Sequence, residues 1–165
     1  MRGTLDTFLF SQLNFENVRQ GFFKVAEGAV YVLAQAICRD LDEVLALTGS
    51  REWVETEDPY MDAVFDTIHD YYNADVKAVL DPDYHNSLLR DSICCVIENY
   101  VASLLKASSN KCTIDSRFFN RLVLEKEIIL DYAKDNSVDE KVFFHFICIY
   151  RILLTILFLV YFSPT

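Results

Sequence analysis

The sequence predicts an all-α fold, built as an antiparallel bundle or rod of long helices. Apolar side chains recur at steps of three and four residues along four long stretches, which is the pattern of helices with one buried face. The sequence contains no sustained apolar–polar alternation and no Asn-Gly or Asp-Gly hairpin turn, so no strand is predicted. Only four Gly and three Pro occur among the 165 residues. The short links that remain between long helices favour antiparallel neighbours.

The first helix is predicted to run from about Phe15 to Leu47. The sequence Thr48-Gly49-Ser50 ends it, because Gly49 readily adopts the left-handed backbone conformation found after many helices. The apolar side chains that recur at the helical period in this stretch are Phe22, Ala26, Ala29, Val30, Leu33, Ile37, Val44 and Leu45.

The second and third helices are each predicted to begin at an Asp-Pro pair, Asp58-Pro59 and Asp81-Pro82. The aspartate side chain can accept hydrogen bonds from the free N–H groups of the first turn, and proline loses nothing at the first helical position. The apolar positions of the second helix are Met61, Val64, Phe65, Ile68, Tyr72, Val76 and Val79. Those of the third helix, which is predicted to end near residues 108–110, are Leu89, Ile93, Val96, Ile97, Tyr100, Val101 and Leu104.

A fourth helix is predicted to begin near Asp115, and a fifth is predicted to follow it. Ser137 and Glu140 have the spacing of a capping box, in which two side chains satisfy free backbone N–H groups at the start of a helix. The apolar side chains of the fourth helix are Phe119, Leu122, Val123, Ile129, Leu130 and Ala133. Its charged side chains, predicted to occupy most of the other side, are Arg117, Arg121, Glu125, Glu127 and Asp131.

Charge and cysteine content limit the classes of function. The formal net charge of −10 argues against a nucleic-acid surface, because phosphate binding needs clustered Lys and Arg. The five Cys are odd in number, match no disulfide framework and follow no secretory signal sequence. We therefore expect buried free thiols in a reducing, cytosolic compartment.

No catalytic, cofactor-binding or metal-ligating residue is predicted, and the chain is not expected to be an enzyme. His69 and His85 are isolated in the sequence, so a surface or capping role is expected for each. The adjacent Cys94 and Cys95 lack the C-x-x-C spacing of a zinc site and are expected to be buried thiols. An acidic chain contains carboxylate clusters without any selection for acid–base chemistry, so solvated faces are expected for them. The clusters considered are Asp40, Asp42 and Glu43, and Glu55, Glu57 and Asp58.

Three aromatic doublets lie on the predicted helices. Neighbouring positions on a helix differ by about 100°, so one member of a doublet can enter the core while the other contacts a further helix or a partner. The doublets are Phe22-Phe23, Tyr71-Tyr72 and Phe118-Phe119.

The end of the chain has a different composition from the rest. Residues 142–165 contain no acidic side chain and one Lys or Arg, Arg151. We therefore divide the chain into a helical body, residues 1–141, and an apolar tail, residues 142–165. At a helical rise of about 1.5 Å per residue, residues 142–162 are long enough to cross a hydrocarbon core about 30 Å thick. Arg151, near the middle of that span, opposes insertion by about 2.5–3.5 kcal/mol.

Two stretches of the body resemble a known family. In residues 74–107, Asp75-Val76-Lys77 precedes a helix that ends with Tyr100-Val101 and Leu104-Leu105. In residues 115–135, the resembling positions are Arg121, Leu122, Glu125, Glu127, Ile128 and Leu130. With Lys24 to Val44 of the first helix, these stretches are similar to the C-terminal region of the family of exocyst complex component 3, the Sec-six subunit. The resemblance covers roughly residues 15–141.

This resemblance implies a rod of stacked antiparallel helical bundles, the type shared by multisubunit tethering complexes. It implies a non-enzymatic protein that helps to tether secretory vesicles to the plasma membrane during exocytosis. The implied partners are other exocyst subunits and the membrane-fusion (SNARE) machinery, and the implied location is cytoplasmic and peripheral at the plasma membrane. No motif assigns a partner site to particular residues.

Three hypotheses stay open for the tail. In the first, residues 142–162 contact and span a membrane, and the chain is a tail-anchored membrane protein with a helical cytosolic body. In the second, these residues form a buried terminal helix packed on the body or on another subunit. In the third, the tail is not original to the family, because the family continues after Val142 with a charged amphipathic helix.

Overall fold

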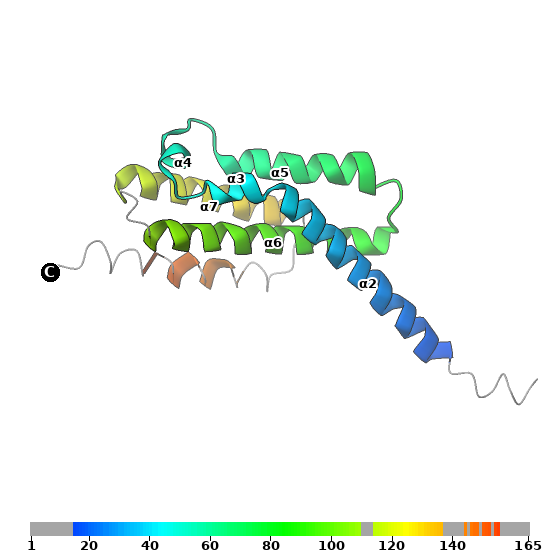
Figure 1. Cartoon of the computed structure of the whole chain (residues 1–165). Helices are drawn as coiled ribbons and strands as arrows, with labels where there is room; N and C mark the ends of the chain where they lie inside the picture. The colour runs from blue at the N-terminus through cyan, green and yellow to red at the C-terminus, as the bar shows by residue number, and fades with distance from the viewer. Residues whose placement is uncertain are drawn as a thin grey trace, which may run out of the picture.

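The computed structural model consists of helices and turns, with no strand in the part of the chain that it describes, and confirms the predicted all-α fold (Figure 1). The structure describes residues 15–109 and 114–136, and in the tail residues 144, 146–148, 150–152 and 154–155. The elements are α2 (Phe15–Asp40), α3 (Asp42–Ala46), α4 (Arg51–Glu55), α5 (Tyr60–Tyr71), the π-helical turn η1 (Tyr72–Val76), α6 (Pro82–Ser109) and α7 (Ser116–Asp135). The predicted capping box at Ser137 and Glu140 lies outside the described residues, as do Cys112 and the 141–142 boundary.

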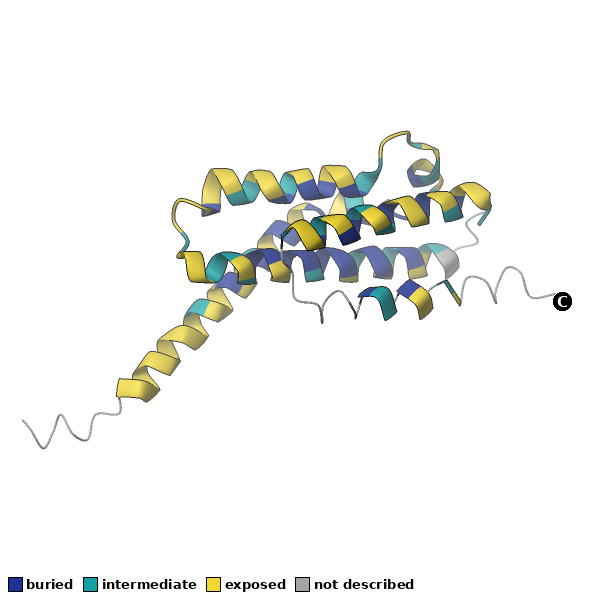
Figure 2. Cartoon of the chain, turned by 180° about the vertical axis from the view of Figure 1, so that it is seen from behind, coloured by how far each residue is buried: buried dark blue, intermediate teal, exposed yellow. Residues whose placement is uncertain are grey.

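Helix α6 supplies much of the core. It runs along the length of the body, and α2 crosses it at an angle (Figure 1). Helices α2 and α3 pack against α6, while α4 and α5 pack against α7. The seven apolar positions predicted for the third helix are all buried in α6, so that prediction is confirmed (Figure 2).

The predicted first helix is interrupted at Leu41. Helix α2 ends one residue before this buried leucine, and α3 begins one residue after it. Val30, Ile37 and Leu45 are buried, as their place in the apolar pattern predicts.

The N-terminal half of the same helix is the exception. It projects beyond the body, and its ribbon is coloured almost wholly as exposed (Figure 2). Phe22 is 73% exposed and Ala29 is also exposed, so the prediction that they belong to the buried face is wrong. The pattern of these residues is helical, but no helix in the described part of the chain covers that face.

A tight turn and a short helix follow α3. Gly49 has φ 79°, which confirms the predicted left-handed turn, and a Cβ atom there would lie 2.6 Å from the Cβ of Ala107. The Ser50 hydroxyl accepts a hydrogen bond of 3.1 Å from the Trp53 backbone N–H and so caps α4. Helix α4 was not predicted, because five residues are too short to display a helical period.

Helix α5 differs from its prediction at both ends. The Asp58 side chain does not cap it: Pro59 occupies the N-cap position, and no side chain from that position caps the helix. At the other end, the Lys77 N–H donates to the Tyr72 carbonyl at 2.8 Å, which is π-helical spacing. The helix stops there, so Val79 falls in a turn and is 82% exposed rather than part of the buried face.

Aspartates begin α6 and α7 as predicted. The Asp81 carboxylate accepts a hydrogen bond of 3.0 Å from the Asp83 N–H. The Asp115 carboxylate accepts from the N–H groups of Arg117, at 2.9 Å, and Phe118, at 3.1 Å. The bond from Phe118, followed by that from the Arg117 side chain, holds the pKa of Asp115 below its ordinary value.

The predicted charged side of α7 is wrong at two positions. Arg121 is 6% exposed and Glu125 is fully buried, whereas Val123 is 51% exposed. Arg121 lies three residues after the buried Phe118, and Glu125 lies four residues before the buried Ile129, so both side chains share the buried face. Their charges are opposite and four residues apart, which allows them to be buried together.

The aromatic doublets follow the prediction only in part. Phe118 is buried and Phe119 is half-buried, as expected for one inward and one outward ring. The two tyrosines of the Tyr71-Tyr72 doublet are both half-buried, whereas Phe22 and Phe23 are both exposed. Neither member of this last doublet enters the core, so the prediction is wrong for it.

Candidate interaction surfaces

In the described part of the chain, an open apolar surface lies along α2. Its members recur at steps of three and four residues, as in the seam of a coiled coil, and all of them are exposed. We call this set the α2 seam; it consists of Phe15, Val18, Phe22, Val25, Ala29, Val32 and Ala36. The other side of α2 carries Val30, Ala34 and Ile37, which are buried. Helix α2 therefore has two apolar faces, of which the body covers one.

Two glycines flank the α2 seam. Gly21 and Gly28 lie one heptad apart, and a Cβ atom added at either would meet no other atom within 4 Å. Glycine inside a helix costs about 1 kcal/mol relative to alanine, and no contact in the described structure compensates for it. A strip without side chains lets the backbone of another helix approach closely.

The charged residues of the projecting half balance one another. The Arg19 guanidinium pairs with Glu16 at 2.9 Å and lies 5.6 Å from the centre of the Phe23 ring. The hydrogen bond from this arginine is the main reason that the pKa of Glu16 lies below its ordinary value.

Among the described helices, α2 is the one that is long and apolar enough to cross a membrane. Core helices of soluble proteins also meet this criterion of length and composition.

A buried polar network holds α4 and α5 on α7. The Glu125 carboxylate accepts hydrogen bonds from Trp53 Nε1, at 2.8 Å, and from the Tyr60 backbone N–H, at 2.9 Å. Arg121 lies 3.6 Å from the same carboxylate and donates to the backbone carbonyl of Asp58 at 2.6 Å. The Arg121–Glu125 pair of α7 thus provides hydrogen-bond partners for polar groups of α4, of α5 and of the link between them.

Burial dominates the electrostatics of this network. It raises the pKa of Glu125 above its ordinary value, although the bonds from Trp53 and Tyr60 and the charge of Arg121 act in the opposite direction. Burial, followed by the charge of Glu125, also raises the pKa of Tyr100 well above its ordinary value. The Glu125 side chain is fully buried, so we assign the network a structural role.

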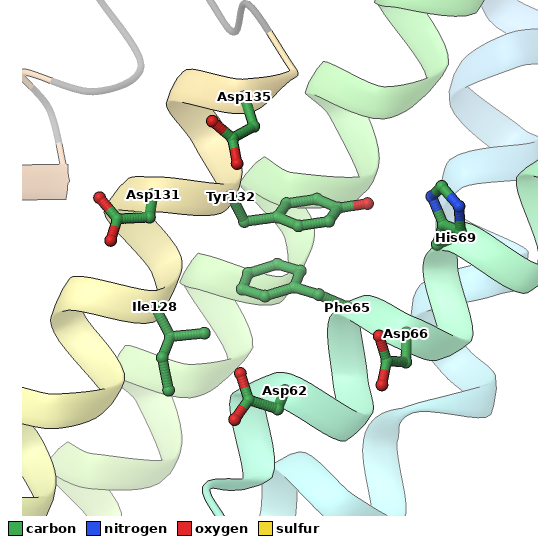
Figure 3. A pocket seen from close by; sticks show the side chains of 8 residues that line it. All are labelled: Asp62, Phe65, Asp66, His69, Ile128, Asp131, Tyr132 and Asp135. Carbon is green, nitrogen blue, oxygen red and sulfur yellow. The ribbon is translucent and has the colours of Figure 1, made fainter.

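An acidic groove lies between α5 and α7. It has a volume of about 430 Å³ and is lined by Asp62, Phe65, Asp66, His69, Ile128, Asp131, Tyr132 and Asp135 (Figure 3). The rings of Phe65 and Tyr132 are stacked, with centroids 4.1 Å apart and planes inclined by 7°. His69 is exposed at this groove, in agreement with the surface role predicted for it.

The other residues considered in the sequence have structural surroundings. His85 Nε2 lies 2.9 Å from the carbonyl oxygen of Leu80, which fits a capping role. Cys38 and Cys95 are buried free thiols, and Cys94 is half-buried. The six carboxylates of the two predicted acidic clusters are all exposed. Within the described ranges, no three His, Cys, Asp or Glu side chains are placed to hold a metal ion.

The described part of the tail packs on the body. Phe146 and Tyr150 are buried, and the Tyr150 hydroxyl donates to the Leu122 carbonyl of α7 at 3.0 Å. Lys126 Nζ lies 5.8 Å from the centre of the Tyr150 ring. Arg151 is exposed. This arrangement matches the hypothesis of a terminal helix packed on the body for the residues that the structure describes.

An all-α body with an open apolar helix face is typical of a component of a larger helical assembly. The family model of exocyst complex component Sec6 matches residues 10–142, which is most of the chain. The chain therefore belongs to the exocyst complex component Sec6 family.

Family membership confirms the exocyst Sec6 part of the resemblance seen in the sequence. The family acts in exocyst-mediated vesicle tethering, assembles with other exocyst subunits and is in general non-enzymatic. It is cytoplasmic and works near sites of exocytosis. The family match ends at residue 142, where the apolar tail begins. No solved structure matches the chain.

Proposed function

We propose that this chain is part of exocyst complex component 3, and that it helps to tether secretory vesicles at the plasma membrane by packing the α2 seam against a helix of another exocyst subunit. Residues 1–141 form the rod segment in this proposal, and residues 142–165 form an added tail. Contact with the SNARE machinery belongs to the same proposal and rests on the family resemblance.

The observation that carries the proposal is the exposure of the α2 seam. Phe22 and Val25 are 73% and 72% exposed. Burying a Val or Phe side chain contributes about 1.5–3 kcal/mol before the entropic cost of association, and five of the seven seam positions are Val or Phe. The small side chains of Ala29 and Ala36 in the seam, together with Gly21 and Gly28 that flank it, leave room for the backbone of the partner helix.

The described part of the tail favours a peripheral protein over a tail-anchored one. Phe146 and Tyr150 would have to leave the body before residues 142–162 could enter a bilayer as one helix. Arg151, which is exposed to solvent, would then have to enter the hydrocarbon core.

The test is recovery of exocyst subunits with tagged chain expressed in cells that contain the complex. In a variant carrying Phe22→Ser and Val25→Ser, recovery is expected to fall at least about tenfold, because two apolar contacts are removed. The matched control carries Val79→Ser and Val123→Ser, which remove two exposed valines outside the seam and should leave recovery unchanged. Thermal unfolding followed by circular dichroism checks that both variants are folded. Equal recovery with the seam variant and the control would exclude α2 as the assembly surface.

A further inference from the structure

The order of large and small side chains along the α2 seam is self-complementary. We infer that a second copy of this chain covers the seam while the protein is free, with the two α2 helices antiparallel. This inference rests on the proposed function in taking the α2 seam as the assembly surface, and it adds a regulation of that surface. The second copy has to leave before a helix of another subunit can bind.

A twofold axis between Phe23 and Lys24 places large side chains opposite smaller ones. In a symmetric pair of antiparallel helices, positions equally far from the axis face each other, and each contact occurs twice. No layer of such a pair contains two phenylalanines or two alanines, and all the side chains concerned are exposed in the free chain. The facing pairs, with the second member taken from the second copy, are Phe22 and Val25, Val18 and Ala29, and Phe15 and Val32.

A parallel pair of α2 helices would pack less well. Each seam residue would face the same residue of the second copy, so Phe22 would meet Phe22 and Ala29 would meet Ala29. Overfilled and underfilled layers both destabilise an apolar core. The order of sizes in the seam therefore favours the antiparallel orientation.

The two glycines beside the seam allow close contact between identical helices. Gly21 and Gly28 lie one heptad apart and so flank the seam on the same side. In an antiparallel pair, the same flank of both helices lies on one side of the interface, so the glycines of one copy lie beside those of the other. With no side chain at these positions, the two backbones can approach along this side.

Charge does not oppose this pairing, although the whole chain has a formal charge of −10. The paired stretch, residues 15–32, is neutral because it contains two acidic and two basic side chains: Glu16, Glu27, Arg19 and Lys24. Most of this stretch projects beyond the body (Figure 2). The antiparallel pair therefore holds the two bodies at opposite ends of a helical stretch about 27 Å long. That length exceeds the Debye length of about 8 Å at physiological ionic strength, so repulsion between the acidic bodies is screened.

The first experiment measures the mass of the full chain by sedimentation equilibrium, at concentrations up to about 100 µM. The native chain is expected to form a dimer. The variant carrying Phe22→Ser and Val25→Ser should dimerise at least about a hundredfold more weakly, because symmetry removes four apolar side chains from the interface. The control carrying Val79→Ser and Val123→Ser should dimerise like the native chain. Circular dichroism checks that both variants are folded.

The second experiment tests the orientation with two charge variants. Phe22→Glu and Val25→Lys each place a charge in two central layers, so each variant alone should be monomeric. Mixed in equal amounts, the two variants should form a heterodimer. The introduced glutamate of one chain faces the introduced lysine of the other in the antiparallel register, and does not in the parallel one. A mixture that stays monomeric would overturn the inference.

A native chain that is monomeric at about 100 µM would also overturn the inference, as would a dimer that the Phe22→Ser, Val25→Ser change leaves intact. Association beyond two copies would count against it too, because a twofold pair is closed. None of these results decides the proposed function, which depends on the recovery of exocyst subunits. A monomeric native chain, with subunit recovery lost in the Phe22→Ser, Val25→Ser variant, would exclude the second copy and support assembly with another subunit.

Discussion

The Tyr60 backbone N–H donates a hydrogen bond of 2.9 Å to the carboxylate of Glu125, so a side chain of α7 caps the first turn of α5. The two residues are 65 positions apart in the sequence. The second oxygen of the same carboxylate accepts from Trp53 Nε1 of α4 at 2.8 Å. One buried carboxylate therefore connects three helices, and it replaces the local cap that Asp58 was predicted to provide.

The first prediction concerns Glu125→Gln. This change removes the charge that compensates Arg121, and it places an N–H₂ group opposite one of two N–H donors. Loss of one partner of a buried ion pair costs about 3–5 kcal/mol, so the free energy of unfolding in urea at pH 7 should fall by that amount. Glu127→Gln is the control, because Glu127 is 53% exposed, and it should change stability by less than about 0.5 kcal/mol. Similar small effects of both substitutions would contradict a structural role for Glu125.

The second prediction concerns pH. The native pKa of Glu125 is raised above the ordinary value of 4.5, first by burial. Between these two pKa values the native state binds more protons than the unfolded state, so stability falls as pH rises. The contribution of this shift is complete below pH 4.5 and is lost as pH rises through the native pKa. The difference in unfolding free energy between the native chain and Glu125→Gln should therefore shrink with rising pH and then become constant. A difference that grows with pH would show that the pKa is lowered instead.

The third prediction compares two glycines. Gly49→Ala places a Cβ atom 2.6 Å from Ala107 at a position with φ 79°, and should destabilise the fold by about 1–3 kcal/mol. Gly28→Ala meets no atom within 4 Å inside a helix, and should stabilise the isolated chain by about 0.5–1 kcal/mol. Thermal unfolding of the two variants should therefore shift in opposite directions. Shifts of the same sign would contradict this assignment of the two backbone positions.

The fourth prediction concerns the tail. Tyr150→Phe removes the hydrogen bond to the Leu122 carbonyl while keeping the ring, and should cost about 0.5–1.5 kcal/mol in urea unfolding. Phe144→Ala is the control, since Phe144 is 67% exposed and should have little effect on stability.

The same packing predicts the behaviour of the expressed chain towards membranes. If the tail packs on the body, alkaline carbonate should release the full chain from the membrane fraction. Retention of the chain in the pellet, together with no effect of Tyr150→Phe on stability, would instead support a membrane anchor.

Much of the fold follows from the sequence, because helix periodicity and capping are local properties. The buried face of α6 and the aspartate caps of α6 and α7 lie where the sequence predicts them. The misses have two causes. Helix α4 and the π-helical turn are too short to show a period, and the burial of Arg121 and Glu125 depends on partners in α4 and α5 that periodicity does not detect.

The candidate surfaces were less predictable than the helices. The aspartates that α5 contributes to the groove lie more than 60 positions from those of α7 in the sequence, and only the packing of α5 on α7 brings them together. Of the α2 seam, only Phe22 and Ala29 belong to the face that the sequence predicts to be buried, and their exposure follows from the projection of α2 beyond the body.

The sequence by itself determined that this protein is helical, where most of its helices begin and that it is similar to an exocyst subunit, because these depend on residue types at short spacings. The tertiary structure decided which of two apolar faces of α2 is covered, which charges are buried and which carboxylate caps α5. Those outcomes depend on contacts between residues far apart in the chain, and the free energy of burial is defined only once those contacts exist.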